Sequence, residues 1–117
     1  MFNNSPEPPY YAVIFTSRLM QKESAEYGEM AQEMGDLAKK QEGFLGVESV
    51  RGEDGCGITV SYWKTLEAID RWKNDLRHRE AQRRGKTEWY SAFSLRVCTV
   101  ERDRFFAKSG AENESRD

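Results

Sequence analysis

The spacing of hydrophobic residues changes several times along the chain and divides it into strand-like and helix-like stretches. From Tyr10 onward two alternating sets, both largely apolar, predict a strand covered on both faces that turns polar at residues 16–18. After Ser24, a suitable helix N-cap, apolar residues recur every three or four positions as far as Ala38. This stripe predicts a helix that ends near Gly43, because glycine suits a left-handed C-terminal position.

The next stretch contains two further strands around a strong turn signal. Residues 44–50 predict a second strand, and the glycine-rich segment 51–57, with its Asp-Gly pair, predicts the hairpin turn that ends it. Residues 58–63 predict a third strand. Its alternation predicts two faces, with Ile58, Val60 and Tyr62 on one and Thr59, Ser61 and Trp63 on the other.

A second helix and a fourth strand complete the pattern. The helix is predicted to begin at the cap Thr65, with one apolar face made by Leu66, Ile69, Trp72 and Leu76. Because residues 75–84 are very polar, we expect a break or kink near residues 73–77, and an end at Gly85. Residues 89–102, beginning with Trp89, predict a long last strand, in which Phe93, Leu95 and Val97 fall on one face.

The order β-α-β-β-α-β predicts an α+β fold of the ferredoxin-like, split-βαβ kind. This fold has a four-stranded antiparallel sheet with both helices on one face. We expect Phe93, Leu95 and Val97 to lie on the other face and to be buried by a second copy, which predicts a homodimer. Residues 1–9 are expected to form a disordered arm, 10–106 the domain, and 107–117 a disordered tail.

Composition and charge limit the possible partners. The chain has 117 residues, of which 38% are hydrophobic and 32% charged, so it predicts one small domain with a thin core. The net charge of -2, with both signs mixed along the chain, argues against nucleic-acid binding. No apolar run approaches the ~20 residues of a membrane span, and the first residues do not resemble a signal peptide. We therefore expect a cytoplasmic protein with no membrane partner.

Metal and nucleotide sites are not expected. Cys56 and Cys98 stand apart and form no Cys-x-x-Cys pair, and one histidine does not complete a zinc site. Three glycines cluster in residues 51–57, but they belong to a hairpin turn and not to the strand-to-helix turn of a phosphate-binding loop. The two thiols are interpreted as reduced and inert.

Six short segments together carry a family resemblance. They are Tyr-Ala-Val-Ile-Phe at 11–15, Gly-Phe-Leu-Gly-Val-Glu at 43–48, Ile-Thr-Val-Ser-Tyr-Trp at 58–63, Ala-Ile-x-x-Trp-Lys at 68–73, His-x-x-Ala-Gln at 78–82 and Trp-Tyr at 89–90. Over about residues 10–102 the chain resembles the antibiotic-biosynthesis-monooxygenase-type domains of the dimeric α+β barrel superfamily. The resemblance implies a ligand pocket inside each subunit, between the sheet and the two helices. Members include cofactor-independent monooxygenases of polyketide quinones, haem-degrading oxygenases and small isomerases.

The haem-degrading branch of the superfamily can be compared residue by residue. That branch relies on an asparagine late in the first strand, a tryptophan in the second helix and a haem-ligating histidine ten residues beyond it. Aligned on Trp72, these positions fall on Ser17, Trp72 and Gln82, so only the tryptophan is kept. His78 follows Trp72 by only six residues. We therefore expect no axial ligation of haem by Gln82.

His78 is the candidate catalytic residue, because it is the only side chain whose charge ordinarily switches near neutral pH. At the mouth of a pocket it would donate or accept a proton. The alternative is a surface histidine on a solvated helix, since charged residues surround it on both sides.

Trp72 is the candidate pocket wall, since a large indole suits a planar aromatic ligand. Core packing is the alternative interpretation. The further candidates for substrate binding are Phe15, Ser17, Met34 and Tyr62.

Three functions remain open at this point. The first is a cofactor-independent monooxygenase acting on a small aromatic, quinol-like molecule. Such chemistry requires a substrate that forms a stabilised carbanion and reduces oxygen itself, so no cofactor is expected. The second is a non-catalytic, ligand-binding or stress-related dimer that uses the same cavity. The third is a haem-binding or haem-degrading protein.

Overall fold

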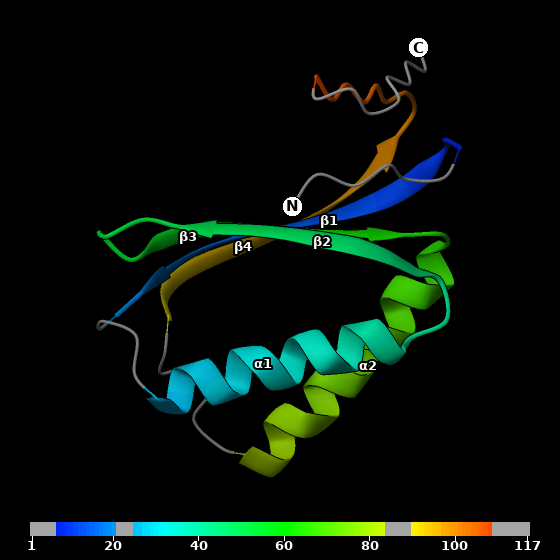
Figure 1. The fold of residues 1–117 in the computed structure, drawn as a ribbon. Coiled ribbons are helices and arrows are strands. Elements are labelled where there is room, and N and C mark those ends of the chain that lie inside the picture. Colours follow the sequence, from blue (N-terminus) through cyan, green and yellow to red (C-terminus); the bar gives the residue numbers. More distant parts are fainter. Residues whose placement is uncertain (1–6, 21–24, 84–89, 109–117) are drawn as a thin grey trace.

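The computed structural model describes residues 7–20, 25–83 and 90–108; within its helices, the side chains of residues 25–27, 30 and 77–83 lie outside the description. The elements follow the order β-α-β-β-α-β, as the sequence predicts (Figure 1). Their bounds are β1 (Tyr10–Leu19), α1 (Ala25–Lys40), β2 (Phe44–Arg51), β3 (Cys56–Trp63), α2 (Leu66–Arg83) and β4 (Tyr90–Val100). Ser24, Gly85 and Trp89, and most of the expected terminal arm and tail, lie outside the described residues.

The four strands form one sheet in the order β2-β3-β1-β4, and each neighbouring pair is antiparallel. Both helices lie on the same side of this sheet, and no helix of the described residues lies on the other side (Figure 1). The predicted ferredoxin-like architecture is therefore confirmed. Its two sheet faces differ in what covers them, and this difference decides where a ligand or a partner can approach.

The strand register shows which side chains share the helix-facing side. Tyr11 is opposite Trp63 and Val13 is opposite Ser61, and the buried Trp63 packs under the helices. Since side chains alternate along a strand, the residues between these point to the helix-free side. The helix-free set includes Ala12 and Ile14 of β1, Glu48 and Val50 of β2, Ile58, Val60 and Tyr62 of β3, and Arg96 and Cys98 of β4.

One face assignment from the sequence is wrong. Phe93, Leu95 and Val97 are opposite the helix-facing residues Ser17, Phe15 and Val13, so they lie on the helix-facing side. They are nevertheless 58%, 38% and 44% exposed. The reason is that β4 is an edge strand paired to β1, whereas the helices pack mainly over β2 and β3.

Helix α2 also differs from the expectation. It is continuous from Leu66 to Arg83, so the predicted break near residues 73–77 is absent. The N–H of Ala68 donates to Oγ1 of Thr65 at 3.1 Å, which confirms the predicted cap. The buried face is carried by Ala68 and Ile69, whereas Leu66, expected on that face, is 47% exposed.

Gly43 has a positive φ of 95°, as its predicted left-handed position requires. It does not directly follow α1, which ends at Lys40, but belongs to a turn in which the N–H of Phe44 donates to the carbonyl of Gln41 at 3.2 Å. A Cβ atom at this position would lie 2.9 Å from the Cβ of Ala68. The turn that leads from α1 into β2 therefore needs glycine for its backbone and for its contact with α2.

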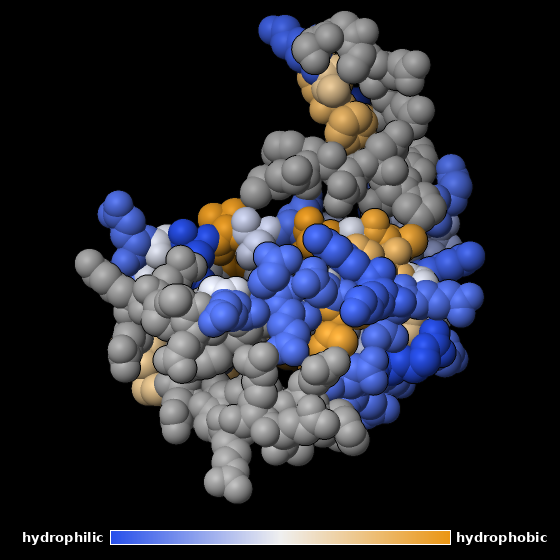
Figure 2. All heavy atoms as spheres, turned by 60° about the horizontal axis from the view of Figure 1, so that its bottom comes forward, coloured by the Kyte–Doolittle hydropathy of each residue, from blue (hydrophilic) through white to orange (hydrophobic). Residues whose placement is uncertain are grey.

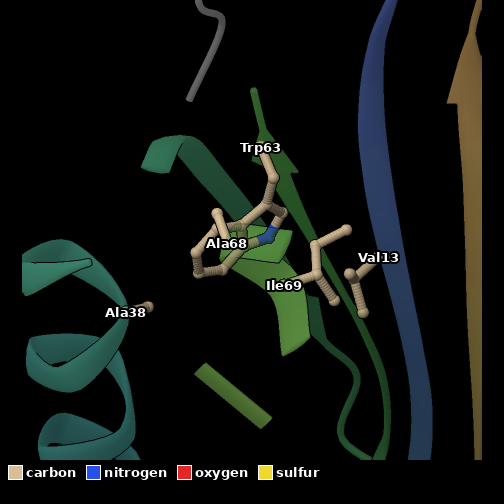
Figure 3. Close-up of a cluster of buried hydrophobic side chains, with 5 residues drawn as sticks. All are labelled: Val13, Ala38, Trp63, Ala68 and Ile69. Carbon is tan, nitrogen blue, oxygen red and sulfur yellow. The ribbon is translucent and has the colours of Figure 1, made fainter. Parts of the chain in front are cut away.

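The main core lies between the sheet and the two helices. Figure 3 shows Ile69 of α2 directed toward Val13 of β1, with the indole of Trp63 beside Ala68 and with Ala38 of α1 across from it. Trp63 has no exposed surface. Burying this indole removes the largest apolar side chain of β3 from water and fixes both helices to the sheet.

The surface of the helix layer is polar. Figure 2 looks toward this layer and shows hydrophilic side chains over most of the described surface, with hydrophobic atoms in separate islands. Among the residues that the structure describes, no helix is long and apolar enough to cross a membrane.

Candidate functional site

A pair of stacked tryptophans forms the centre of the candidate site. The rings of Trp63 in β3 and Trp72 in α2 have centroids 5.1 Å apart and an interplanar angle of 32°. The Nε1–H of Trp63 donates to Oγ of Ser61 at 2.9 Å. The Nε1 atom of Trp72 is buried and has no hydrogen-bond partner among the residues that the structure describes. An unpaired indole N–H in such a place is costly, and an acceptor on a bound molecule would remove that cost.

A second aromatic group lies along β1 and β4 on the same side of the sheet. The ring of Phe15 lies 5.5 Å from that of Tyr90 and 5.6 Å from that of Phe93, measured between centroids. Met34 of α1 packs in a cluster that contains Leu19 and Tyr90. These side chains extend the apolar surface from the core toward the open edge of the sheet.

Ser17 is buried on this side and is engaged by an arginine. Its Oγ accepts a hydrogen bond from Nη2 of Arg51 at 2.9 Å, and Arg51 also donates to the carbonyl of Gly55. A Cβ atom at Gly57 would lie 2.8 Å from Cζ of Arg51, so the glycine leaves room for the guanidinium. This network ties the β2–β3 hairpin to β1.

Tyr62 does not belong with the other candidates. It stands between Ser61 and Trp63, both of which face the helices, so the alternation of β3 directs it to the helix-free side. There its hydroxyl donates to Oε1 of Glu48 at 2.7 Å. Burial, together with this hydrogen bond and the negative charge of Glu48, raises the pKa of Tyr62 to about 12. The prediction that Tyr62 lines a pocket with Trp72 is therefore corrected.

His78 and Gln82 lie in the second half of α2, but their side chains are outside the described part of the chain. The sequence argument for placing His78 at a pocket mouth relied on a kink that would open the helix. Because α2 is continuous, that argument no longer holds, and the catalytic role of His78 stays a prediction.

The described side chains on the helix-facing side are mainly aromatic and aliphatic. They include the stacked rings of Trp63 and Trp72, and the indole N–H of Trp72 has no hydrogen-bond partner among the described residues. Among the described residues no group of three histidine, cysteine or acidic side chains is arranged to hold a metal ion. The two cysteines are free thiols.

Sequence reasoning missed two members of these aromatic groups. Trp63 supplies the ring against which Trp72 stacks, and Phe93 extends the rings of β1 and β4. The signal for Trp63 was present, because it shares its strand face with Ser61 and directly precedes the helix that covers it. The signal for Phe93 was its register with Ser17, which only the paired strands reveal.

Comparisons with known proteins agree on the fold. The chain is 48% identical over 107 residues to the uncharacterized protein YqjZ of Bacillus subtilis (strain 168), covering 92% of this chain and 93% of YqjZ. Its structure is similar to that of SnoaB, a cofactor-independent oxygenase from Streptomyces nogalater, with a TM-score of 0.61 and 16% identity over 78% of this chain and 92% of SnoaB. It is also similar to PA3566 from Pseudomonas aeruginosa, with a TM-score of 0.55 and 13% identity over 81% of this chain and 95% of PA3566.

The family follows from the match of the sequence itself. Residues 10–84, which include β1, both helices and the β2–β3 hairpin, match the antibiotic biosynthesis monooxygenase family. The matched segment contains Trp63 and Trp72 and most of the described core. The chain therefore belongs to the antibiotic biosynthesis monooxygenase family.

Proposed function

We propose that this protein is a cofactor-independent monooxygenase that acts on a small aromatic, quinol-like molecule on the helix-facing side of the sheet. Membership of the monooxygenase family and the structural similarity to a cofactor-independent oxygenase support this class of reaction. The observation that carries the proposal is the buried Nε1–H of Trp72, whose ring stacks on Trp63 and whose N–H has no hydrogen-bond partner in the described part of the chain.

The proposed reaction uses the substrate itself as the reductant. A proton leaves an acidic carbon of the substrate, and the resulting anion transfers electrons to O₂ and forms a carbon–oxygen bond. One oxygen atom stays on that carbon as a carbonyl, and the other leaves as water with the two hydrogens that the carbon loses. Trp72 would donate a hydrogen bond to the oxygen that carries the negative charge, because a positioned donor in a dry site stabilises an anion strongly.

His78 is the proposed proton acceptor. It is the single histidine of the chain, and imidazole has the ordinary pKa closest to neutral pH among side chains. A ligand-binding protein without catalysis would need the same aromatic side chains but no base. The effect of replacing His78 therefore distinguishes the two functions.

We further propose that the protein forms a homodimer through its helix-free face. The C-terminal segment 101–108 lies on that side of the sheet (Figure 1). The hydroxyl of Tyr10 donates to Asp103 of this segment at 2.7 Å. The segment does not cover the whole face, because Val50 and Ile58 remain 61% and 50% exposed. Apolar side chains exposed in this way on a small domain favour a partner surface.

The test of the reaction uses anthrone, a three-ring aromatic ketone with an acidic methylene group. Purified protein treated with a metal chelator should consume O₂ and form anthraquinone. Replacing Trp72 by Phe keeps an aromatic ring but removes the N–H, so kcat/KM should fall by ~100-fold, the usual effect of losing one anion-stabilising donor. His78→Ala should lower kcat by ~100-fold or more. Asn74→Ala, at an exposed position of α2, is the matched control and should leave turnover unchanged.

Three outcomes decide between the functions. Turnover that depends on Trp72 and His78 supports the monooxygenase. Quenching of tryptophan fluorescence by anthrone without O₂ consumption would replace it with the ligand-binding function. If the protein neither binds nor turns over anthrone and a hydroxylated anthrone, the proposed substrate class is overturned.

A further inference from the structure

Four residues, one from each strand, form a single row across the helix-free face. The register places Glu48 of β2 opposite Val60 of β3, Val60 opposite Ile14 of β1, and Ile14 opposite Arg96 of β4. The row therefore has a carboxylate at one edge of the sheet, two apolar side chains in the middle and a guanidinium at the other edge.

The rows on either side of this one contain no charged residue. One consists of Gly46, Tyr62, Ala12 and Cys98, and the other of Val50, Ile58, Thr16 and Ser94. Glu48 and Arg96 are thus the two charges in the central three rows of the face, and they stand on opposite edge strands. This distribution has a direct consequence for a second copy that packs on the same face.

We propose that the homodimer has its two-fold axis parallel to the strands, so that Glu48 of each copy pairs with Arg96 of the other across the helix-free faces. This inference rests on the homodimer proposed above and specifies how its two sheets are aligned. Such an axis exchanges the two edges of the sheet, which brings β2 of one copy over β4 of the other. The interface is self-complementary, as a two-fold interface must be, and it contains the ion pair twice.

The same axis also brings apolar side chains together between the edges. It places β3 over β1, so that Val60 of each copy faces Ile14 of the other. Two sheets that pack face to face in this way lie ~10 Å apart. A two-fold axis perpendicular to the strands would instead place Glu48 over Glu48 and Arg96 over Arg96, and like charges that face one another cost binding energy.

Glu48 and Arg96 both retain the capacity to pair in this way. Oε1 of Glu48 accepts the hydrogen bond from Tyr62, which orients the carboxylate, and a carboxylate has a second oxygen. Nη1 of Arg96 donates to Oγ of Ser94 at 2.8 Å, and a guanidinium has five N–H donors. Packed sheets are rotated by about 30°, which displaces the edge strands, and the long side chain of Arg96 can span that displacement.

The test reverses each charge in turn in the full-length protein. In Arg96→Glu the introduced carboxylate faces Glu48 of the other copy, and in Glu48→Arg the introduced guanidinium faces Arg96. Each variant alone should therefore have a dimer dissociation constant raised by ~100-fold or more, measured by sedimentation velocity. Arg71→Glu, which reverses an exposed charge on α2 outside this face, is the control and should dimerise as the unchanged protein does.

Mixing the two variants gives the decisive measurement. A mixed dimer of Arg96→Glu with Glu48→Arg contains two opposite-charge pairs, so its dissociation constant should return to within ~10-fold of the original value. A variant that simply failed to fold would not be rescued in this way. Unchanged dimerisation of the single variants, or loss of the dimer without rescue on mixing, would overturn the pairing.

Two results separate this inference from the proposed function. A protein that is monomeric before any substitution overturns the homodimer and the pairing together. A dimer that is insensitive to both charge reversals overturns the pairing alone. The turnover of anthrone tests the reaction separately and does not depend on either result.

Discussion

At the scale of single residues, Tyr62 shows that the side of the sheet on which a strand residue lies decides what its side chain contacts. The sequence places Tyr62 with Ile58 and Val60 on one face and Trp63 with Ser61 on the other, and both groupings are correct. The sequence does not say which of these faces the helices cover. Because Trp63 is the residue that the helices bury, Tyr62 meets Glu48 on the other side and not a ligand beside Trp72.

The raised pKa of Tyr62 gives the first prediction at this scale. Its pKa of about 12 in the folded state is above the ordinary value of 10.0, so the folded protein holds the phenolic proton more tightly than the unfolded chain does. The stabilisation is therefore fully present below pH 10 and is lost as the pH rises toward 12. In a spectrophotometric titration of tyrosinate, the ionisation of Tyr62 should appear as a late step near pH 12.

The assignment is checked by substitution. Tyr62→Phe should remove the late step and make the unfolding free energy less dependent on pH between 10 and 12. Glu48→Gln keeps a hydrogen-bond acceptor but removes the negative charge, so the ionisation of Tyr62 should shift toward its ordinary value. A late step that survives in Tyr62→Phe would belong to another tyrosine and contradict the assignment.

Trp72 and His78 differ in how much of their position and role the sequence alone predicts. The position of Trp72 on the apolar face of α2 follows from helical spacing, and its stacking on Trp63 confirms that it faces the sheet. Its unpaired Nε1–H could not be predicted, because hydrogen bonding depends on neighbours that are distant in the chain. The spacing places His78 in the same helix and says nothing about a cavity.

At the scale of elements, α2 shows why polar composition alone does not end a helix. Residues 75–83 are mostly charged or amide residues, and arginine, glutamate, glutamine and alanine all have good helix propensity. The polar half therefore continues the helix although it has little apolar surface to bury. One member of the apolar face was misplaced. Leu66 lies at the first turn, where it is exposed, and the smaller Ala68 makes the close contact with Gly43, whereas Ile69 and Trp72 pack in the core as predicted.

This face of α2 is testable with two matched truncations. Ile69→Ala removes a side chain that is 1% exposed and that packs toward Val13, so the unfolding free energy should fall by about 2–5 kcal/mol. Leu66→Ala removes a leucine that is 47% exposed on the same helix, and it should cost less than about 1 kcal/mol. Urea denaturation of both variants measures the difference, and equal losses would contradict the described face.

The edge strand β4 shows the same limit of sequence reasoning for strands. Alternation correctly groups Phe93, Leu95 and Val97 on one side. Their apolar character favours burial, so the sequence suggested the face that a partner would cover. The register with β1 instead puts them on the helix-facing side, beyond the cover of the helices, where they border the aromatic surface of the candidate site.

At the scale of the whole molecule, the order of the elements was enough to predict the fold. Strong turn signals around Gly55 and a continuous apolar stripe in α1 separate the elements, and β-α-β-β-α-β has one common antiparallel arrangement with both helices on one face. What the order does not fix is how the exposed area divides between the two faces. That division is set by the positions of the helices over β2 and β3.

The exposed helix-free face gives the last prediction, which concerns the stability of the assembly. If two copies cover each other there, folding and dimerisation are coupled, and the Tm must rise with protein concentration. Each tenfold increase in concentration contributes about 1.4 kcal/mol per dimer, or half of that per chain. For a chain of this size a hundredfold increase should raise the Tm by about 5 °C.

Calorimetry or circular dichroism over a hundredfold range of concentration measures this dependence. The Arg71→Glu control should show the same slope, because its charge lies outside the interface. Arg96→Glu alone should show a lower Tm at each concentration, and its Tm should begin to rise only at concentrations ~100-fold or more higher than for the unchanged protein, since the carboxylate facing Glu48 opposes association. A Tm that stays constant for the unchanged protein while it sediments as one small species would mean that the face functions without a second copy. Val50 and Ile58 would then be exposed in solution as they are in the single chain.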